Sequence, residues 1–187
     1  MNPAGASRWW RLAASVVIFE SAWLACVISA AHQVMGWGIG AVLASILWQL
    51  AISDRRGADL VLISAAFVTG LVWDTLLTQT HIVVYASHAP FAAAAPLWIL
   101  ALWMQLGSVL RDPLRWLHDR PGIAAGLGGL GGAAAYAGAA RLGACEFPNL
   151  ALAMAVLASG WGVLLTLLLR LARRWDLPVP APAQRSP

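Results

Sequence analysis

The chain has 187 residues, of which 60% are hydrophobic and only 11% are charged, and its mean hydropathy is +0.73. Soluble domains carry about 25% charged residues, so this composition argues against a soluble enzyme and predicts a membrane protein with several spans. All 12 basic residues are arginine, which excludes Schiff-base chemistry on lysine. The arginines stand between apolar segments, so the net charge of +4 indicates membrane topology and no nucleic-acid partner.

Apolar runs of about 17–25 residues are candidate membrane-spanning helices, and the sequence contains six. They cover residues 12–31, 37–52, 58–78, 91–110, 122–140 and 148–169, and the second is the shortest. We therefore predict an all-α polytopic bundle of six transmembrane helices that forms one domain over residues 1–170. The proline-rich end, residues 171–187, has too few apolar residues for a core and is predicted to be a disordered cytoplasmic tail.

The arginines are distributed unequally between the two sides of the predicted bundle. Eleven of the 12 precede the first segment, follow the sixth, or lie in the connections after the second and fourth segments, whereas the other three connections contain only Arg141. The positive-inside rule then predicts that both termini are cytoplasmic. A cleaved signal peptide is the alternative for the first segment, but its apolar run is too long and Glu20 interrupts it.

A polar cluster is predicted near the outer end of the third segment. Asp74 stands in an apolar run, where a charged side chain costs about 2.5–3.5 kcal/mol at the bilayer centre, so it should face protein or water. Asp74 and Thr78 are four residues apart and share a helix face, which His81 extends if the helix continues. Arg141 ends the fifth segment at a similar depth, and Glu146 follows it. We expect an Asp74–Arg141 ion pair that joins two helices; the alternative is an outward-facing pocket in which His81 moves protons.

Glu20 is the second acid inside an apolar segment, about 12 Å into the first helix at ~1.5 Å per residue. No basic residue is expected at its depth. It should therefore be protonated, accept a hydrogen bond from an indole or from an amide such as Gln49 or Gln105, or face a hydrated cavity. A helix–helix hydrogen bond is favoured, and a proton-carrying carboxyl group is the alternative.

The fifth segment contains almost no large side chains, which predicts close helix packing. Gly122 and Gly126, and also Gly128 and Gly132, are spaced four residues apart, a spacing that lets two helix backbones approach. A G-x-G-x-x-G match ends at Gly131, but no strand precedes it and the glycines lie at membrane depth. We therefore expect packing and no dinucleotide site.

The histidines and cysteines do not have the spacing of a metal site. His32, His81 and His88 all fall in outward loops, yet no H-x₃-H or C-x₂-C pattern is present, and we predict no metal and no cofactor. Cys26 and Cys145 both approach the outer face, where a disulfide is possible in an oxidising compartment. Small buried apolar residues are the favoured interpretation of these two cysteines.

The fourth segment begins after Pro96 and carries Trp98 and Trp103. Indole rings pack well and favour the membrane interface, so we expect packing and interface anchors. An aromatic-lined groove for a lipid or another ligand is the alternative.

Several short motifs together resemble a family of small bacterial inner-membrane proteins known only as a domain of unknown function. The motifs are GLVWD at 70–74, APLWILALW at 95–103, LRWL at 114–117, GGLGG at 128–132, Tyr136 and RLGA at 141–144. This chain has Ala133 where the family tends to have proline, and Gln105 where an aromatic residue is usual. The resemblance implies a multi-pass protein of the bacterial inner membrane, with no assigned activity or catalytic residue. It also implies a connection to lipid metabolism, because relatives often stand beside lipid-modifying enzymes.

Three functions are therefore open. The leading hypothesis is a non-enzymatic membrane component that assists lipid modification or the response to envelope stress, with membrane lipids and a membrane-bound lipid-modifying enzyme as partners. The second is a small proton-linked transporter that uses Glu20 and Asp74. The third is an intramembrane enzyme that acts on lipid at the cluster of Asp74, His81 and Arg141. Two helical hairpins related by a pseudo-symmetry axis, with a cavity at mid-depth, would favour the transporter. A closed bundle without a cavity, in which Asp74 pairs with Arg141, would favour the accessory component. A lateral groove that opens to lipid beside His81 would favour the enzyme.

Overall fold

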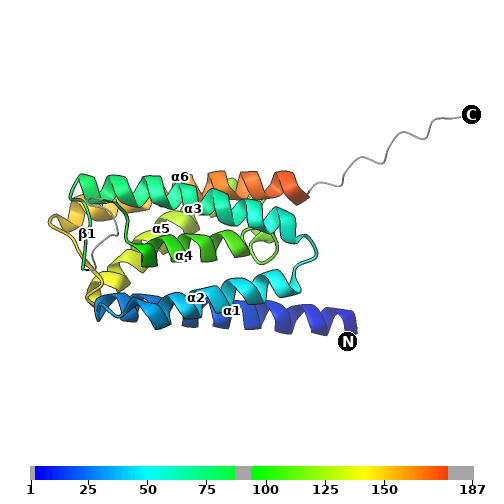
Figure 1. The fold of residues 1–187 in the computed structure, drawn as a ribbon. Coiled ribbons are helices and arrows are strands. Elements are labelled where there is room, and N and C mark those ends of the chain that lie inside the picture. Colours follow the sequence, from blue (N-terminus) through cyan, green and yellow to red (C-terminus); the bar gives the residue numbers. More distant parts are fainter. Residues whose placement is uncertain (1–2, 87–93, 177–187) are drawn as a thin grey trace, which may run out of the picture.

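The computed structural model describes residues 3–86 and 94–176, and it confirms the predicted all-α bundle (Figure 1). In chain order its elements are α1 (Pro3–Ala31), α2 (Met35–Ile52), α3 (Arg56–Gln79), β1 (Val84–Tyr85), α4 (Leu97–Val109), the short 3-10 helix η1 (Arg115–Leu117), α5 (Pro121–Arg141), β2 (Cys145–Glu146) and α6 (Leu150–Asp176). Strands β1 and β2 form a two-stranded antiparallel sheet in which Tyr85 is opposite Cys145.

Four of these helices are long and apolar enough to cross a membrane, which indicates a membrane protein. They are α1, α3, α5 and α6, whereas α2 and α4 are shorter apolar helices. The 13 residues of α4 extend only about 20 Å at ~1.5 Å per residue, less than the ~30 Å hydrocarbon core of a bilayer. Six complete spans and the orientation of the bundle therefore stay predictions.

Several predicted boundaries differ from the structure, and the first helix begins at Pro3, nine residues before the predicted start at residue 12. The fourth helix begins at Leu97, six residues later than predicted, because Pro96 is extended and a residue before proline disfavours the helical conformation. The sixth helix continues to Asp176, so residues 171–176 of the predicted disordered tail are helical. Arg173 and Arg174 lie in its last turn, where positive charge stabilises a helix end. The remainder of the predicted tail, residues 177–187, lies outside the described part.

Helix α4 lies at the centre of the bundle. Nine of its 13 residues are buried, and it packs against α1, α2 and α3. A helix that is apolar all round is expected in such a position. Helix α1 packs mainly on α2, and α5 packs mainly on α6, so α1 and α5 flank α4 as members of different pairs (Figure 1).

The outer surface of the bundle is rich in large apolar side chains. Soluble monomers rarely expose contiguous apolar patches of this kind, whereas lipid accommodates them. Exposed examples are Val17 and Leu24 on α1, Leu47 on α2, Val68 and Val72 on α3, Leu130 on α5, and Val163 and Leu167 on α6.

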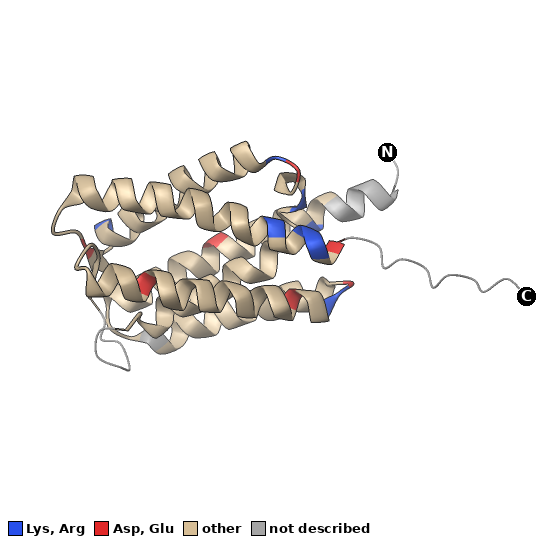
Figure 2. Ribbon diagram, turned by 90° about the horizontal axis from the view of Figure 1, so that it is seen from above, with Lys and Arg blue, Asp and Glu red and all other residues tan. Residues whose placement is uncertain are grey.

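Apart from Arg141, the arginines whose side chains the structure describes gather at one end of the bundle, the end where α1 begins and α6 finishes (Figure 2). Arg141 lies at the opposite end, with the loop between α1 and α2 and the strands β1 and β2 (Figures 1 and 2). We call these the arginine-rich end and the strand end. The arginines that the sequence places on one side of the membrane thus lie at one end of the bundle, and Arg141 lies at the other end. This agrees with the distribution from which the orientation was predicted.

The glycines of α5 divide into two groups. A Cβ added at Gly128 would lie 2.6 Å from the carbonyl oxygen of Trp161, and one at Gly132 would lie 2.2 Å from the Trp161 ring, so both allow α6 to approach closely. A Cβ at Gly122 or Gly126 meets nothing within 4 Å. The structure thus places only the second of the two predicted glycine pairs against another helix.

Candidate functional site

Asp74 is the centre of a buried hydrogen-bond cluster. Its side chain is fully buried, and three neutral donors surround its carboxylate. The hydroxyl of Tyr136 donates to Oδ1 over 2.5 Å, and the indole Nε1 of Trp103 donates to Oδ2 over 2.5 Å. The hydroxyl of Tyr85 also donates to Oδ1. We call these four residues the Asp74 centre.

Four separate elements bring the Asp74 centre together. Asp74 lies on α3, Trp103 on α4 and Tyr136 on α5, while the pairing of β1 with β2 holds Tyr85. Gly70 lies one turn before Asp74, and a Cβ there would be 2.1 Å from Cγ of Trp103. Only glycine at this position lets the indole ring lie against α3 and reach the carboxylate.

The structure does not bring the other residues of the predicted cluster to the Asp74 carboxylate. Arg141 is exposed at the end of α5, and within the described residues Asp74 has no ion pair, so the predicted Asp74–Arg141 pair is wrong. The three neutral donors already satisfy the carboxylate, and a cation is not needed. Thr78 donates its hydroxyl to the backbone oxygen of Asp74 over 2.8 Å. Helix α3 ends before His81, which is exposed with φ of 54°, and Glu146 is exposed on β2.

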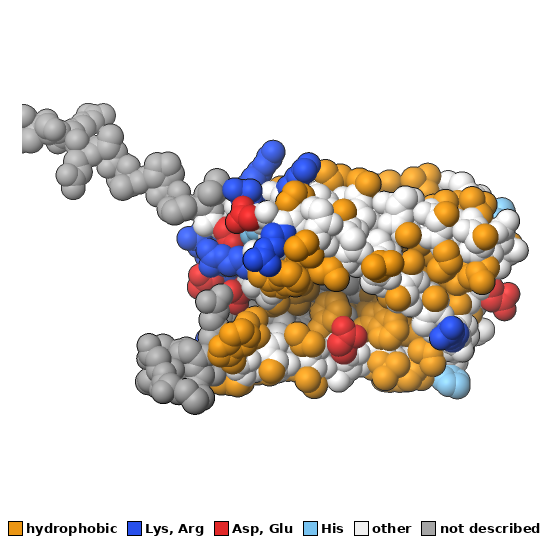
Figure 3. Space-filling model, turned by 180° about the vertical axis from the view of Figure 1, so that it is seen from behind, with side chains coloured by type: hydrophobic (Ala, Val, Ile, Leu, Met, Phe, Trp, Pro, Cys, Tyr) orange, Lys and Arg blue, Asp and Glu red, His pale blue; other side chains and the backbone are white. Residues whose placement is uncertain are grey.

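An apolar groove with a volume of about 520 Å³ lies directly beside the Asp74 centre. Figure 3 shows it as a hollow lined by hydrophobic side chains on one face of the bundle. Helices α1, α4, α5 and α6 and the 3-10 helix η1 contribute its walls, and Trp103 and Tyr136 belong both to the groove and to the Asp74 centre. We call this hollow the lateral groove.

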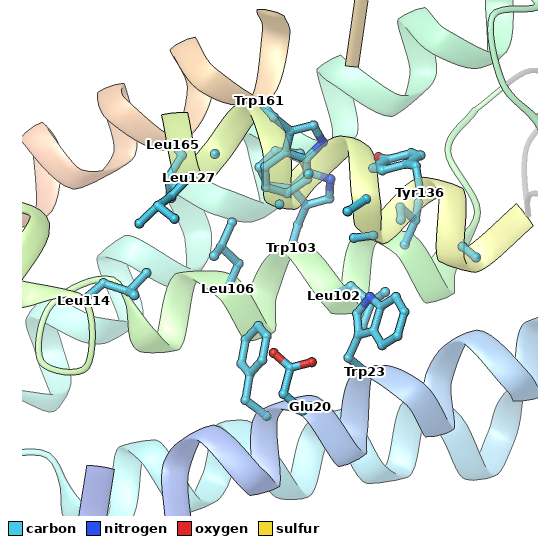
Figure 4. A pocket seen from close by; sticks show the side chains of 18 of the residues that line it. Glu20, Trp23, Leu102, Trp103, Leu106, Leu114, Leu127, Tyr136, Trp161 and Leu165 are labelled. Atoms are coloured by element: carbon cyan, nitrogen blue, oxygen red, sulfur yellow. The ribbon is translucent and has the colours of Figure 1, made fainter. Parts of the chain in front are cut away.

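Aromatic rings form the wall between the lateral groove and Asp74 (Figure 4). The rings of Trp103 and Trp161 are stacked, with centroids 4.5 Å apart and planes 13° apart. Tyr136 meets Trp161 edge-on at 6.3 Å. Because Trp103 and Tyr136 are also hydrogen-bonded to Asp74, the wall is fixed on its buried side. Trp98 lines the groove as well, so the packing role and the groove predicted for these tryptophans occur together.

Glu20 lies at the lateral groove, on α1, and its side chain is exposed there (Figure 4). It makes no hydrogen bond or ion pair within the described residues. Gln105, one of its predicted partners, instead donates to the backbone oxygen of Phe19 over 3.0 Å and to Ser45 over 3.1 Å. Glu20 thus faces a cavity lined mostly by apolar side chains, and the hydration predicted for such a cavity stays a prediction.

A second polar site, at the arginine-rich end, was missed by the sequence reasoning. Arg111 is only 5% exposed; its Nε lies 2.8 Å from Asp59, and its Nη2 lies 2.6 Å from Asp54 and 3.0 Å from Ser53. Asp176, at the end of α6, lies 3.7 Å from its Nη1. We call this set the Arg111 network. A signal was present, because five of the eight acidic residues fall at the arginine-rich end.

The pKa values in the Arg111 network follow from these contacts. The hydrogen bond from Arg111 lowers the pKa of Asp54. Burial opposes the charge on Arg111, but its hydrogen bonds to Asp59 and Asp54 outweigh burial and raise its pKa. Through these contacts the network joins α3, α6 and the turn between α2 and α3.

The structure shows no metal-binding group of histidine, cysteine and acidic residues within residues 3–86 and 94–176. His88 lies outside these residues. Cys26 and Cys145 are both buried and both free, so the alternative of a disulfide between them is not realised.

Comparison with known proteins identifies a family and no individual relative. No curated protein and no solved structure matches the chain at a significant level. A family model described as "Protein of unknown function (DUF2878)" matches residues 12–167, which include the Asp74 centre, the lateral groove and Arg111. The chain therefore belongs to this family of proteins of unknown function.

Proposed function

We propose that this protein is a multi-pass component of the bacterial inner membrane that binds the hydrocarbon chain of a membrane lipid in its lateral groove. In this role it assists a membrane-bound lipid-modifying enzyme without itself catalysing the reaction. The observation that carries the proposal is the open apolar groove, whose aromatic wall is fixed from behind by Asp74. A bundle with only a structural role has no need for such a hollow.

The size and lining of the groove support this proposal. Ligand sites typically enclose about 300–1,000 Å³ and are lined mostly by apolar and aromatic side chains. The groove of about 520 Å³ falls within this range, and Glu20 is its only charged lining residue. A hydrocarbon chain that moves from the bilayer into the groove gains no hydrophobic free energy, because both surroundings are apolar. The selectivity of the groove for one lipid must therefore come from packing against the fixed aromatic wall.

The closed bundle with an Asp74–Arg141 pair that was expected for an accessory component is not found within the described residues, so the proposal rests on the groove as a binding site. The contacts of the Asp74 centre give the other two hypotheses less support. Three donors bind the carboxylate of Asp74 and its side chain is fully buried, so a cargo ion or a substrate has no access to it. His81 and Arg141, the other members of the proposed catalytic cluster, are exposed and make no hydrogen bond to Asp74. A transporter or an enzyme would therefore have to use Glu20 alone among the predicted groups.

The test is photocrosslinking in phospholipid vesicles that contain a lipid with a diazirine in its acyl chain. Trp161 lines the groove, whereas Leu130 is 76% exposed on the outer face of α5 and reports ordinary surrounding lipid. We expect labelling of Trp161 as well as Leu130 in the wild type, measured by peptide mass spectrometry. Labelling of Leu130 without Trp161 would contradict the proposal.

A matched pair of variants isolates the groove. Gly131 lines it and Gly126 does not, yet a Cβ at either position meets nothing within 4 Å, so both accept a larger side chain. Gly131→Phe should lower the ratio of Trp161 to Leu130 labelling by about tenfold, which corresponds to ~1.4 kcal/mol. Gly126→Phe should leave the ratio unchanged; an equal loss in both variants would point to a change in the bundle and against a groove site.

A further inference from the structure

The position of Glu20 along the groove carries an inference about the ligand. Glu20 lies near the middle of α1, nine residues after Arg11 and 11 residues before the end of the helix at Ala31. At ~1.5 Å per residue these separations are about 14 and 17 Å. Figure 4 shows its carboxylate directed from α1 toward α4, with Trp23 beside it and Leu102 and Leu106 opposite.

The protein supplies this carboxylate with no partner of its own. Glu20 lines the lateral groove and also the smaller adjoining hollow, where Ser15 is the only other polar lining residue, and neither hollow contains a basic side chain. An acidic group at the bilayer centre costs about 2.5–3.5 kcal/mol when nothing compensates it. The amide of Gln105, one of the two donors named in the sequence analysis, is already bonded to the backbone oxygen of Phe19 and to Ser45.

We infer that the groove selects a lipid that carries a hydroxyl or amine group on its long apolar chain, and that this group donates a hydrogen bond to Glu20 at mid-depth. The inference rests on the proposed function. A phosphate or carboxylate would find no basic side chain to bind it among the described residues that line the groove. The shared chemistry is a hydrogen-bond donor on an apolar chain, as in long-chain alcohols and long-chain amines.

Competition for the groove tests this inference. Three probes with the same long alkyl chain, a primary alcohol, a primary amine and a methyl ester that has no donor, compete with the diazirine lipid for labelling of Trp161 in phosphatidylcholine vesicles. We expect the alcohol and the amine to displace the label at about tenfold lower concentration than the ester, a difference of ~1.4 kcal/mol. This comparison uses the wild-type protein and does not depend on whether any variant folds.

Two variants assign the preference to Glu20. Glu20→Leu should remove the preference of the groove for the donors and leave ester binding intact. Glu20→Gln should keep the preference for the alcohol, because the amide oxygen still accepts a hydrogen bond, but should lose most of the preference for the amine. Ser21→Leu is the control, since Ser21 is the next residue on α1, is exposed and does not line the groove.

The outcomes separate the inference from the proposed function. Equal displacement by all three probes, with labelling that still depends on Gly131, would overturn the inference and leave the groove as a chain-binding site. A preference for donors that persists in Glu20→Leu would also overturn it. Absence of any Trp161 labelling would instead contradict the proposed function.

Discussion

The Asp74 centre and the Arg111 network each stabilise a buried charged side chain, the first with neutral hydrogen-bond donors and the second with ion pairs. Both contain a charged side chain with little or no exposure, 0% for Asp74 and 5% for Arg111. Asp74 lies on an apolar helix that is able to cross a membrane, and its partners are two phenols and one indole. Arg111 lies at the arginine-rich end, and its partners are carboxylates and a serine.

The difference shows how position along the bundle selects the partner of a buried charge. A carboxylate paired with a buried cation requires the desolvation of two ions, which costs several kcal/mol for each. Neutral donors provide strong charge-assisted hydrogen bonds without a second ion. Inside an apolar span neutral donors therefore cost less desolvation free energy than an ion pair, while near the water interface a network of ion pairs is tolerated.

The largest expected effect comes from removing the acceptor of the Asp74 centre. Asp74→Leu leaves the hydroxyls of Tyr85 and Tyr136 and the indole of Trp103 without a partner, at about 1–3 kcal/mol for each buried donor. We expect a loss of about 3–6 kcal/mol in the free energy of unfolding, measured by denaturant titration in detergent micelles.

Asp74→Asn is the matched control for this prediction, because the amide has nearly the same shape and keeps one oxygen that accepts a hydrogen bond. It should lose clearly less stability than Asp74→Leu. If the two variants were equally stable, the hydrogen bonds of the Asp74 centre would not be what holds α3, α4 and α5 together.

The next effect is expected in the Arg111 network. Arg111→Met removes the cation and leaves Asp59 buried without its partner, which typically costs about 3–5 kcal/mol. Arg115→Met is the control: Arg115 also approaches an acid, Asp176 at 3.4 Å, but its side chain is 59% exposed, so a change of at most ~1 kcal/mol is expected. Thermal unfolding in the same micelles measures both; similar shifts for the two variants would mean that burial does not distinguish them.

The bundle was predictable because the length of an apolar run indicates the length of a helix. All six predicted segments correspond to helices, and the cost of an acid in an apolar run marked Asp74 as a buried centre. The cost of burying Asp74 predicts that it has hydrogen-bond partners, but it does not predict which residues these are. Tyr136 is 62 residues away, and Tyr85 lies in a strand that no periodicity indicates, so only the folded chain reveals that both reach one oxygen.

The two glycine pairs of α5 show a similar limit. Gly122 and Gly126 have the same spacing as Gly128 and Gly132, but only the second pair lies against α6. Spacing places residues on one helix face, whereas the rotation and crossing of the helix decide which part of that face meets a neighbour. The tryptophans of the fourth segment suggested a groove only as an alternative, and its position was not predictable, because it arises where α1 and α5 pack on different partners.

The smallest effect on stability is expected at Asp54, the exposed partner of Arg111 in the network. The hydrogen bond from Arg111 lowers the pKa of Asp54 in the folded protein below its unfolded value of about 3.9. Its contribution is therefore present above the unfolded pKa and is lost as the pH falls through the folded pKa. Because the Asp54 side chain is 75% exposed, solvent screens the pair and the contribution is at most ~1 kcal/mol.

Asp54→Asn tests this contribution through its pH dependence. The variant should unfold at a lower temperature than the wild type at about pH 6, and the difference should shrink as the pH falls through the lowered folded-state pKa of Asp54, because the wild-type carboxyl then becomes protonated as well. Asp119→Asn is the control, since Asp119 pairs with the exposed Arg173 and not with Arg111. A difference for Asp54→Asn that persists at the lower pH would show that the residue stabilises the turn by its shape. The electrostatic stabilisation of the Arg111 network would then come from Asp59 and not from Asp54.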